Sequence, residues 1–411
     1  MSGRLYADLT QSWSEKGGGV RTYLNRKRRY ILEQTRDQHL LIIPGPEDSV
    51  VEEPRAITVT IRSPRVPGSP NYRFMLRNGA VGAALDRFRP DLIECQDAYN
   101  LPWAALRYRG RNPQTALVAS FMTDFPNAYV RRAGERIGGR WVGDAAANIC
   151  YRYCANLYRR FDRMIALSEH GGADTLRSIG VRRISVVPLG VDIDEFANGV
   201  RDESLRTLAG AADGQPLLVY VGRLDHEKRA AKVVEAFQQL PRALDARLVL
   251  IGAGPLLEQF ERVPGVYATG FIDDAGLLAR WLASADVYVS GMADETFGIS
   301  VIEAQAAGLP VVGVAAGAML DRVPPALGRL GPVDDEAAMA ANIVAVVTDP
   351  DRAVMAEAAR THAASYSWDA AMATLFDQAY PAAFERRAAA SVKARAVRQP
   401  AVAALANDDG L

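Results

Sequence analysis

The sequence predicts an α/β protein built from two doubly wound parallel sheets, and three observations lead to this fold class. From Asp286 to Gly313, a β-branched run, a glycine loop, a helical segment and a Gly-Pro turn lead into a second β-branched run. This is the pattern of one βαβ unit of a parallel sheet. A similar strand, glycine loop and helix start opens the chain at residues 5–24, and a second series of β-runs begins at Leu217 after a polar stretch at 198–215. With 411 residues, the chain is long enough for two domains with full cores.

The composition is that of an ordinary globular protein, with 49% hydrophobic and 23% charged residues. No apolar run approaches the roughly 20 residues of a membrane span, and no basic-then-apolar leader opens the chain, so we expect no signal peptide. Three cysteines, an odd number, suit a reducing cytosol. Cys150 and Cys154 lie four apart, and with no His or Cys nearby they are expected to be buried thiols rather than a metal pair.

The formal charges are distributed unevenly along the chain. Residues 1–190 hold 29 Lys and Arg against 18 Asp and Glu, whereas residues 191–411 hold 19 against 30. Two domains that simply differ in surface would give this split. A first half that faces an anionic acceptor or a membrane surface would also give it.

The first half alternates strands and helices. Strands are expected at 5–9, 40–43, 57–61, 90–96, 116–120 and 163–168, helices at 78–88 and 148–161, and a turn-rich loop at 64–70. The glycines at 17–19 follow the first strand and open a helix, where an absent side chain lets the backbone approach an anion. Gln96, Asp97 and Asn100 follow a buried-type strand, at the end where open α/β sheets place their ligand groups.

Two carboxylates, Glu295 and Glu303, lie eight residues apart in the stretch Asp286–Gly313. Glu295 falls in the glycine loop and Glu303 about two turns into the predicted helix, so one ligand lying along the helix start could touch both. The backbone N–H groups of the residues between them, at the start of that helix, would face the same ligand.

The sequence ETFGISVIEAQAAGLPVV in this setting resembles the signature of glycosyltransferase family 4. Its members are retaining enzymes of the GT-B architecture, in which two Rossmann-like domains face each other across a cleft. The resemblance implies that Glu295 contacts hydroxyls of the donor hexose and that Glu303 binds the ribose of the nucleotide. The alternative is an ordinary α/β unit with a solvated Glu295 and a helix-face Glu303.

The segment from Gly222 to Lys228, GRLDHEK, resembles the family's G-R-L-x-x-E-K motif. In the family its Arg and Lys neutralise the donor diphosphate, which implies this role for Arg223 and Lys228. The chemistry needs such groups, since the leaving nucleoside diphosphate accumulates negative charge that two cations can meet without a metal. The alternative is a pair of surface basic residues beside a tight turn.

Further donor-binding positions follow from the resemblance. The family has a GGV loop at the place of Gly18 and Gly19, a G-x-G-P strand end at the place of Gly254, and backbone near Phe271 that meets the nucleobase. Gly317 and Arg322 follow the signature stretch and are expected near the cleft. The full set of expected donor-binding residues is Gly18, Gly19, Gly222, Gly254, Phe271, Thr296, Phe297, Gly298, Ile299 and Glu303.

The chain departs from the family pattern on the acceptor side. Relatives often read His-Thr-Asp-Phe-Pro where this chain has Met122-Thr-Asp124-Phe-Pro, so Asp124 is the catalytic candidate that remains there. A turn Asp that caps the following segment is the alternative. Asp192-Ile-Asp194 is formally a D-x-D motif, but its setting matches a helix start. We expect no metal and no other cofactor.

Arginines and aromatic residues gather between 128 and 161, among them Tyr129, Arg136, Arg140 and Trp141. Arginine beside aromatic side chains suits a lipid headgroup interface or an anionic acceptor. The expected partners are therefore a nucleotide-sugar donor, a glycan or lipid-linked acceptor and an anionic membrane surface, with no nucleic acid. The expected location is the cytoplasm, and attachment to the inner membrane face is the alternative that stays open.

The resemblance covers about residues 3–385 and implies three segments: an acceptor-side domain at 1–195, a nucleotide-sugar domain at 196–365, and a helix at 366–387 that returns to the first domain. Residues 388–411 are Ala-rich with no periodic apolar face, which predicts a flexible tail. The polar stretch at 198–215 is the expected linker, and Tyr366-Ser-Trp368 matches the family's Y-S-W at the start of the returning helix.

The predicted function is metal-independent transfer of a hexose from a UDP- or GDP-sugar, with retained configuration, to a saccharide, lipid-linked or small-molecule acceptor. A phosphorylase of this architecture needs a lysine-bound pyridoxal phosphate, and no site for one is evident. A sugar-nucleotide epimerase and a non-catalytic donor-binding protein, the latter suggested by Met122, are the alternatives that stay open.

Overall fold

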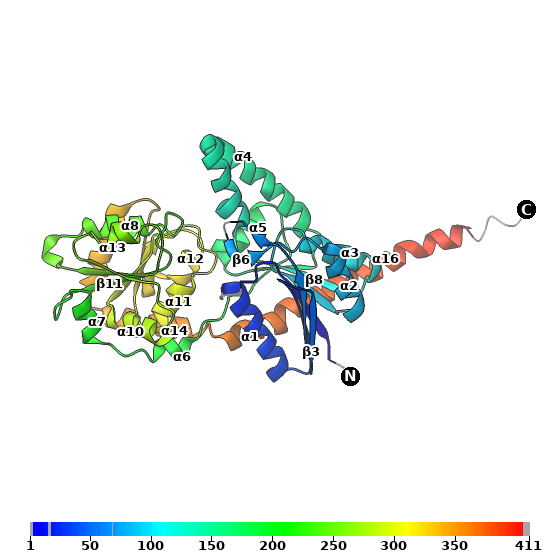
Figure 1. Ribbon diagram of the computed structural model, residues 1–411, viewed down its shortest axis with the longest axis horizontal. Helices are drawn as coiled ribbons and strands as arrows, with labels where there is room; N and C mark the ends of the chain where they lie inside the picture. The colour runs from blue at the N-terminus through cyan, green and yellow to red at the C-terminus, as the bar shows by residue number, and fades with distance from the viewer. Residues whose placement is uncertain (1–2, 15–17, 68, 406–411) are drawn as a thin grey trace, which may run out of the picture. The chain divides into compact units, whose positions relative to one another are not determined.

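The computed structural model describes residues 3–14, 18–67 and 69–405, and its chain forms two compact units (Figure 1). The first unit draws on Met1–Leu167, Ala173–Val187 and Met372–Leu411, and the second on Ser168–Gly172 and Pro188–Ala371. Lys16 and Gly17 of the predicted glycine loop lie outside the described residues. Each unit carries a parallel sheet with helices, which confirms the predicted fold class.

The sheet of the first unit has eight strands in the order β10-β9-β8-β7-β1-β2-β4-β3. All neighbours pair in parallel except β3 and β4, which are antiparallel. The central strands are buried along their whole length, as hydrophobic runs in a covered parallel sheet should be. The strands are β1 (Leu5–Leu9), β2 (Gln38–Gly45), β3 (Ser49–Glu53), β4 (Ala56–Arg62), β7 (Leu92–Cys95), β8 (Ala116–Phe121), β9 (Arg163–Ala166) and β10 (Ile184–Val186).

The helices of the first unit complete its hydrophobic core. They are α1 (Gly19–Gln34), α2 (Asn78–Phe88), α3 (Leu101–Arg111), the π-helical turn η1 (Pro126–Arg131), α4 (Arg132–Tyr158) and α5 (Asp174–Ser178). The helix expected at 148–161 begins earlier, as part of α4. Non-helical angles at Gly138 and Gly139 break α4 into two arms. The two arms of α4 therefore form a hairpin that projects from the unit (Figure 1).

The end of the chain returns to the first unit through α15 (Trp368–Thr374), η5 (Leu375–Ala379) and α16 (Tyr380–Leu405). Tyr380 stacks on Tyr6 of β1 with ring centroids 5.2 Å apart, and Phe376 meets the same ring edge-on at 5.2 Å. The predicted contact of a C-terminal helix with the N-terminal domain is confirmed. Residues 388–405 of the expected tail lie within α16.

The sheet of the second unit has six parallel strands in the order β13-β12-β11-β14-β15-β16. They are β11 (Leu217–Val221), β12 (Arg247–Ile251), β13 (Val266–Gly270), β14 (Val287–Val289), β15 (Val311–Val314) and β16 (Gly328–Gly331). The helices are α6 (Ile193–Ala197), α7 (Glu203–Leu208), α8 (Ala230–Gln238), α9 (Leu257–Phe260), α10 (Ala275–Ser284), α11 (Ile299–Ala306), α12 (Met319–Arg322), α13 (Glu336–Val347) and α14 (Arg352–Ala364). Short helical turns lie at η2 (Glu169–Ala173), η3 (Arg242–Leu244) and η4 (Pro325–Leu327).

Two predicted irregular segments carry regular structure. The expected linker at 198–215 contains α7, which Asp202 begins by accepting a hydrogen bond from the Ser204 backbone N–H at 2.9 Å. The predicted turn-rich loop at 64–70 is instead part of a two-stranded hairpin, β5 (Arg65–Val66) and β6 (Ser69–Arg73). Packing of α7 against α10 stabilises a short helix whose local composition favours turns.

Candidate functional site

In the second unit, the strand order changes direction between β11 and β14, which lie side by side at the centre of the sheet. Open parallel sheets bind ligands outside the carboxyl ends of their strands at such a switch point, because the two following loops part there. The loop after β11 carries Arg223 and Lys228, and the loop after β14 carries Glu295. The topology therefore brings together residues that are about 70 positions apart in sequence.

Lys228 and Glu295 meet directly, because the Lys228 ammonium lies 3.3 Å from the Glu295 carboxylate. Their side chains are 29% and 20% exposed, so a ligand can reach both. Arg223 is more exposed, at 58%, and its guanidinium pairs with Asp225 at 2.6 Å and with Glu227 at 2.8 Å in its own loop. The structure thus brings Lys228 and Glu295 together, while Arg223 is held by acidic neighbours.

The loop after β11 is anchored by backbone contacts that only glycine permits. A Cβ on Gly252 would collide with the carbonyl of Gly222, and a Cβ on Gly254 would collide with the backbone of Leu224. The Leu224 N–H donates to the Ala253 carbonyl at 3.0 Å, and the Tyr220 hydroxyl donates to the Arg223 carbonyl at 3.1 Å. Gly252, and Gly254 of the predicted donor-binding set, therefore have a structural role in fixing this loop.

Small residues pack closely against the backbone of the loop that carries Glu295. A Cβ on Gly171 would lie 2.5 Å from the Glu295 carbonyl, and one on Gly317 would lie 2.8 Å from it. That carbonyl accepts from the Ala318 N–H at 2.8 Å, and the Thr296 carbonyl accepts from the Ser168 hydroxyl at 2.8 Å. The short segment Ser168–Gly172, which belongs to the second unit, thus helps to position Glu295.

The segment after Glu295 turns sharply into α11. Gly298 adopts a left-handed conformation with φ of 86°, and α11 begins at the next residue, Ile299. The first N–H groups of a helix lack intrahelical partners and favour an anion, so the backbone at Ile299 suits a phosphate group. Glu303 is the fifth residue of α11 and lies little more than one turn into the helix, not two as the sequence suggested.

Glu303 sits in a poorly hydrated environment. Burial raises the pKa of Glu303 from 4.5 to about 7, and the charge of Asp192 adds to the increase. Removal of water from the carboxylate penalises its ionised form. Near neutral pH a bound hydroxyl group that donates a hydrogen bond would stabilise the carboxylate, which is what a ribose would supply.

We expect Glu303→Gln to raise the melting temperature at pH 8. The folded-state pKa lies above the ordinary value, so the ionised carboxylate costs stability as pH rises from about 4.5 and costs most above about pH 7. The free energy of unfolding should increase by at most about 3 kcal/mol at pH 8 and change little at pH 4. Thermal denaturation across this range checks it. Glu258→Gln, an exposed exchange on α9, is the matched control, and equal behaviour of the two variants would contradict the prediction.

Arg322 has a clearer role than its place in the sequence indicated. Its side chain is 3% exposed, and its guanidinium lies 4.6 Å from the ring centroids of both Phe297 and Tyr366. It also donates to the Phe297 carbonyl at 2.9 Å and to the Tyr366 hydroxyl at 3.0 Å. Arg322 therefore holds in place the backbone between Glu295 and Glu303. Burial lowers the pKa of its guanidinium.

Phe271 follows β13 and is 74% exposed, which is unusual for a large apolar side chain. Gly270 before it has φ of 73°, so the chain turns sharply at this point. The structure thus presents an aromatic side chain beyond the carboxyl end of the sheet, on the strand next to β12.

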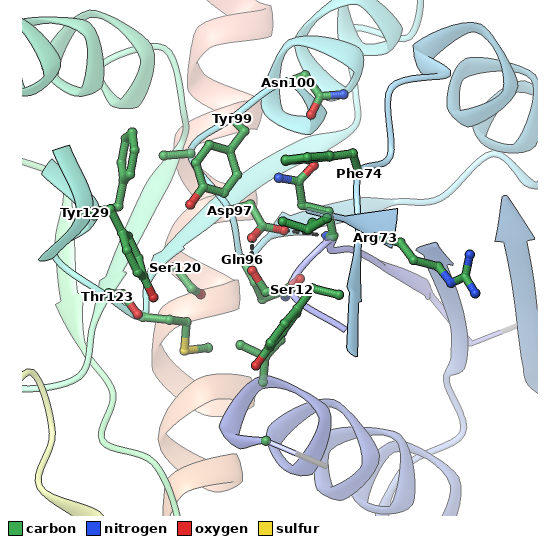
Figure 2. A pocket seen from close by; sticks show the side chains of 18 of the residues that line it. Ser12, Arg73, Phe74, Gln96, Asp97, Tyr99, Asn100, Ser120, Thr123 and Tyr129 are labelled. Carbon is green, nitrogen blue, oxygen red and sulfur yellow. Dashed lines mark hydrogen bonds between the residues drawn. The ribbon is translucent and has the colours of Figure 1, made fainter. Parts of the chain in front are cut away.

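The first unit holds a separate cavity of about 680 Å³ at its own switch point, between β1 and β7 (Figure 2). Gly18 and Gly19 line it, so these two predicted donor-binding glycines lie on the first unit and the other eight residues on the second. The cavity lining is Gln11, Ser12, Gly18, Gly19, Val20, Val66, Ser69, Tyr72, Arg73, Phe74, Leu76, Gln96, Asp97, Ala98, Tyr99, Asn100, Ser120, Met122, Thr123, Phe125, Tyr129 and Tyr158.

A buried charge cluster lies directly behind residues that line this cavity. The Lys27 ammonium contacts Asp8 and Glu94, each at 2.8 Å, and all three side chains are fully buried. The second carboxylate is stabilised by hydroxyl groups, since Glu94 accepts from Tyr380 of α16 at 2.6 Å and from Ser120 at 2.6 Å. The positive charge of Lys27 outweighs the effect of burial and lowers the pKa of Asp8 to about 2.

Asp124 lies beside this cavity, at the start of η1. Its carboxylate accepts from the Tyr151 hydroxyl at 2.7 and 2.8 Å and from the Asn127 N–H at 3.4 Å. These hydrogen bonds agree with the alternative that Asp124 is a turn residue that caps the following segment. Its neighbours Met122, Thr123 and Phe125 line the cavity.

Two further features of the described residues bear on function. Among residues 3–14, 18–67 and 69–405, no three His, Cys, Asp or Glu side chains gather as a metal site would require. Across the same ranges, the helices are too short or too polar to cross a bilayer.

The chain is similar to known glycosyltransferases over most of its length. Residues 17–195 match the family model described as Glycosyltransferase Family 4, and residues 215–349 match that described as Glycosyl transferases group 1. A GDP-mannose-dependent alpha-(1-6)-phosphatidylinositol dimannoside mannosyltransferase of Mycobacterium tuberculosis is 29% identical over 372 residues, which cover 88% of this chain and 92% of that protein. A GDP-mannose-dependent alpha-mannosyltransferase of Mycolicibacterium smegmatis is 31% identical over 64% of this chain and 67% of its own length.

Solved structures show the same fold. Sucrose-phosphate synthase from Thermosynechococcus elongatus superposes with a TM-score of 0.71 at 20% identity, over 92% of this chain and all of that one. Together with the family models and the predicted signature, this match leads to one conclusion. The chain belongs to glycosyltransferase family 4 and is a glycosyltransferase of the GT-B fold.

Proposed function

We propose that this glycosyltransferase moves a mannose unit from GDP-mannose to a glycolipid acceptor, with retained configuration and without a metal ion. The donor follows from the two relatives named above, both of which are described as GDP-mannose-dependent. The acceptor class follows from the first of them, which is described as acting on a phosphatidylinositol dimannoside. The observation that carries the proposal is the Lys228–Glu295 pair beside the start of α11.

The second unit offers each part of such a donor a chemically suitable partner. The diphosphate would lie between Lys228, Arg223 and the first N–H groups of α11, where its charge is met by two cations and by the helix start. The hexose hydroxyls would donate to Glu295, the ribose hydroxyls to Glu303, and the base would lie against Phe271. Because Lys228 already pairs with Glu295 at 3.3 Å, the diphosphate and the hexose would contact adjacent groups.

Catalysis would then rest on the charge that develops on the leaving GDP. Lys228 and Arg223 stabilise this charge, and the family's retaining chemistry lets a donor phosphate oxygen take the proton of the acceptor hydroxyl. Glu295 and Glu303 bind ligand in this scheme and do not form the acid and nucleophile pair of a glycosidase. Arg223 must exchange its contacts with Asp225 and Glu227 for the diphosphate.

The acceptor would bind in the cavity of the first unit. Met122 lines that cavity where many relatives have a histidine, so a weakly active or purely donor-binding protein is the second candidate. Asp124 stays a proposed acceptor-side residue, although its carboxylate already accepts from Tyr151.

Donor turnover tests the proposal. Purified protein is mixed with GDP-mannose, UDP-glucose or UDP-galactose, with and without a phosphatidylinositol mannoside, and free nucleoside diphosphate and glycolipid product are measured. We expect acceptor-dependent GDP release and an elongated glycolipid. Tight GDP binding without turnover on any acceptor would support the donor-binding candidate, and turnover of the donor without acceptor into an isomeric sugar would support an epimerase.

We further propose that the α4 hairpin contacts an anionic membrane that holds the acceptor. Ile137 and Trp141 at its tip are 85% and 81% exposed, and the side chains of Arg136 and Arg140 beside them are exposed as well. The arms pack closely, since a Cβ on Gly134 would lie 2.8 Å from the Gly143 Cα. A closely packed projection with an apolar tip and flanking arginines suits the boundary between headgroups and acyl chains.

Trp141→Ala should lower binding to vesicles that contain phosphatidylglycerol by at least about tenfold, because burial of one large apolar side chain is worth about 1.5–3 kcal/mol and a factor of ten corresponds to about 1.4 kcal/mol. Co-sedimentation with vesicles measures this. Val354→Ala on α14, where the parent side chain is 66% exposed, is the matched control. Unchanged sedimentation of the Trp141 variant would exclude the hairpin tip as the contact.

A further inference from the structure

The cavity of the first unit has an interior rich in hydrogen-bond acceptors. The side-chain carbonyl oxygens of Gln96 and Gln11 are buried and have no hydrogen-bond partner among the described residues. A buried acceptor without a donor costs free energy and calls for an explanation. Both residues line the cavity, so a ligand that brings hydroxyl groups to this wall would satisfy them.

The orientation of the Gln96 amide is fixed by its surroundings. Its Nε2 donates to the Asp8 carboxylate at 2.6 Å and to the Glu94 carboxylate at 3.2 Å. Only the NH₂ group can donate to carboxylates, so the amide cannot be turned around and its oxygen remains an acceptor. The residue is 5% exposed, which holds this arrangement in place.

Carboxylates lie behind and beside Gln96. The Lys27 ammonium is shared between Asp8 and Glu94, and Arg28 donates a hydrogen bond to the adjacent His39 at 2.9 Å. Asp97, also in the lining, uses its carboxylate to accept from the Gln11 N–H at 2.6 Å and from the Thr10 hydroxyl at 3.1 Å. An anionic group at this wall would meet the two unpaired carbonyl oxygens of Gln96 and Gln11, which are acceptors and cannot donate to it.

The rim of the cavity has a different character. Tyr72, Phe74, Tyr99 and Tyr129 are each between 37% and 56% exposed, and Figure 2 shows the last three around the opening near Asp97 and Thr123. Arg73 is the one basic residue among the described residues of the lining. It donates to the Ser63 carbonyl at 2.9 Å, and its guanidinium is directed away from Gln96 and Ser12 (Figure 2). Aromatic rims accommodate the apolar faces of sugar rings and adjoining chains.

We infer that this cavity takes an uncharged polyhydroxylated ring, a sugar or cyclitol, and rejects the same ring when it carries a phosphate. The ring hydroxyls donate to the Gln96 and Gln11 carbonyls, and the aromatic rim covers the ring. This inference rests on the proposed function, since it identifies the acceptor head group, and it makes Gln96 and Gln11 determinants of acceptor specificity. Lys27, Asp8 and Glu94 act through Gln96 as positioning residues.

Calorimetric titration of the full-length protein with GDP present tests the inference. The probes are methyl α-mannopyranoside and the same sugar with a 6-phosphate. We expect the neutral sugar to bind at least about tenfold more tightly than the phosphorylated one, and Gln96→Met and Gln11→Met each to weaken the neutral sugar about tenfold. GDP affinity should be the same in both variants, because the charged groups proposed to hold GDP, Arg223 and Lys228, are on the other unit.

Gln34→Met, an exposed exchange on α1, is the matched control. Gln96→Met also removes a donor from two buried carboxylates and can therefore prevent folding. In that case Gln11→Met still tests the inference. Equal or tighter binding of the phosphorylated sugar would overturn the inference. Undetectable binding of both sugars to a protein that still binds GDP would also overturn the inference. Absence of GDP release from GDP-mannose with sugar binding intact would instead contradict the proposed function and support the cavity assignment.

Discussion

Replacement of Glu295 by alanine is expected to reduce mannose transfer by more than about 100-fold and to leave GDP affinity within about threefold of the parent value. The carboxylate would bind the hexose and not the nucleotide, so the loss falls on the reacting complex. Its removal also frees Lys228, which it contacts at 3.3 Å, to meet the diphosphate. Transfer is followed by product mass spectrometry and GDP binding by calorimetry.

The exposed neighbour Asp294 supplies the control, as Asp294→Ala removes a carboxylate from the same loop. Glu295→Gln distinguishes the need for charge from the need for an acceptor oxygen, because the amide keeps one carbonyl oxygen in place. If Glu295→Ala retained transfer at the parent rate, the assignment of the hexose to this loop would be wrong.

Arg223→Ala is expected to weaken GDP binding about tenfold and to lower the rate of transfer about 100-fold, so that binding and turnover both fail. Lys228→Ala should do the same. Without donor, the two cations pair with different carboxylates. Arg223 pairs with Asp225 and Glu227, whereas Lys228 pairs with Glu295. Each variant removes one of the charges that would offset the leaving diphosphate.

Steady-state kinetics at two ionic strengths checks this second prediction, since an exposed cation that meets a phosphate loses affinity as salt rises. Arg262→Ala, an exposed exchange after α9, is the control for a simple loss of charge. Equal activity of the Arg223 variant and the parent would rule out its diphosphate role.

The sequence predicted the α/β class and the contact of the C-terminal helix with the first unit, and both are confirmed. The fold class was predictable because it depends on local patterns: a β-branched run, a glycine that turns, and a helix start such as Ile299. The contact of the C-terminal helix was implied by the family resemblance at Tyr366-Ser-Trp368 and not by a local pattern. The short strands β3 and β16 went unpredicted. β3 is exposed throughout, so it lacks the alternating pattern on which such predictions depend.

The site was predictable where its residues are neighbours in sequence. Residues 222–228 and 295–303 each contain their own glycine turn and charged groups, and the sheet order brings Lys228 to Glu295. The supports of that site were not predictable, since Ser168 and Gly171 reach the Glu295 loop across more than 120 residues. The locked amide of Gln96 likewise depends on Asp8, 88 positions earlier in the chain.

The hydrogen bond from Tyr380 to the buried Glu94 carboxylate joins residues 286 positions apart and has a consequence for biosynthesis. Lys27, Gln96 and Ser120 are made early and contact the same carboxylate, but its set of hydrogen bonds is complete only when nearly the whole polypeptide has left the ribosome. The first unit is therefore completed last. The second unit consists of Pro188–Ala371 and the short segment Ser168–Gly172, which are all made before residue 372. This unit can therefore fold before the first unit is complete. A nascent chain stalled before residue 372 should therefore protect its middle from protease before its beginning.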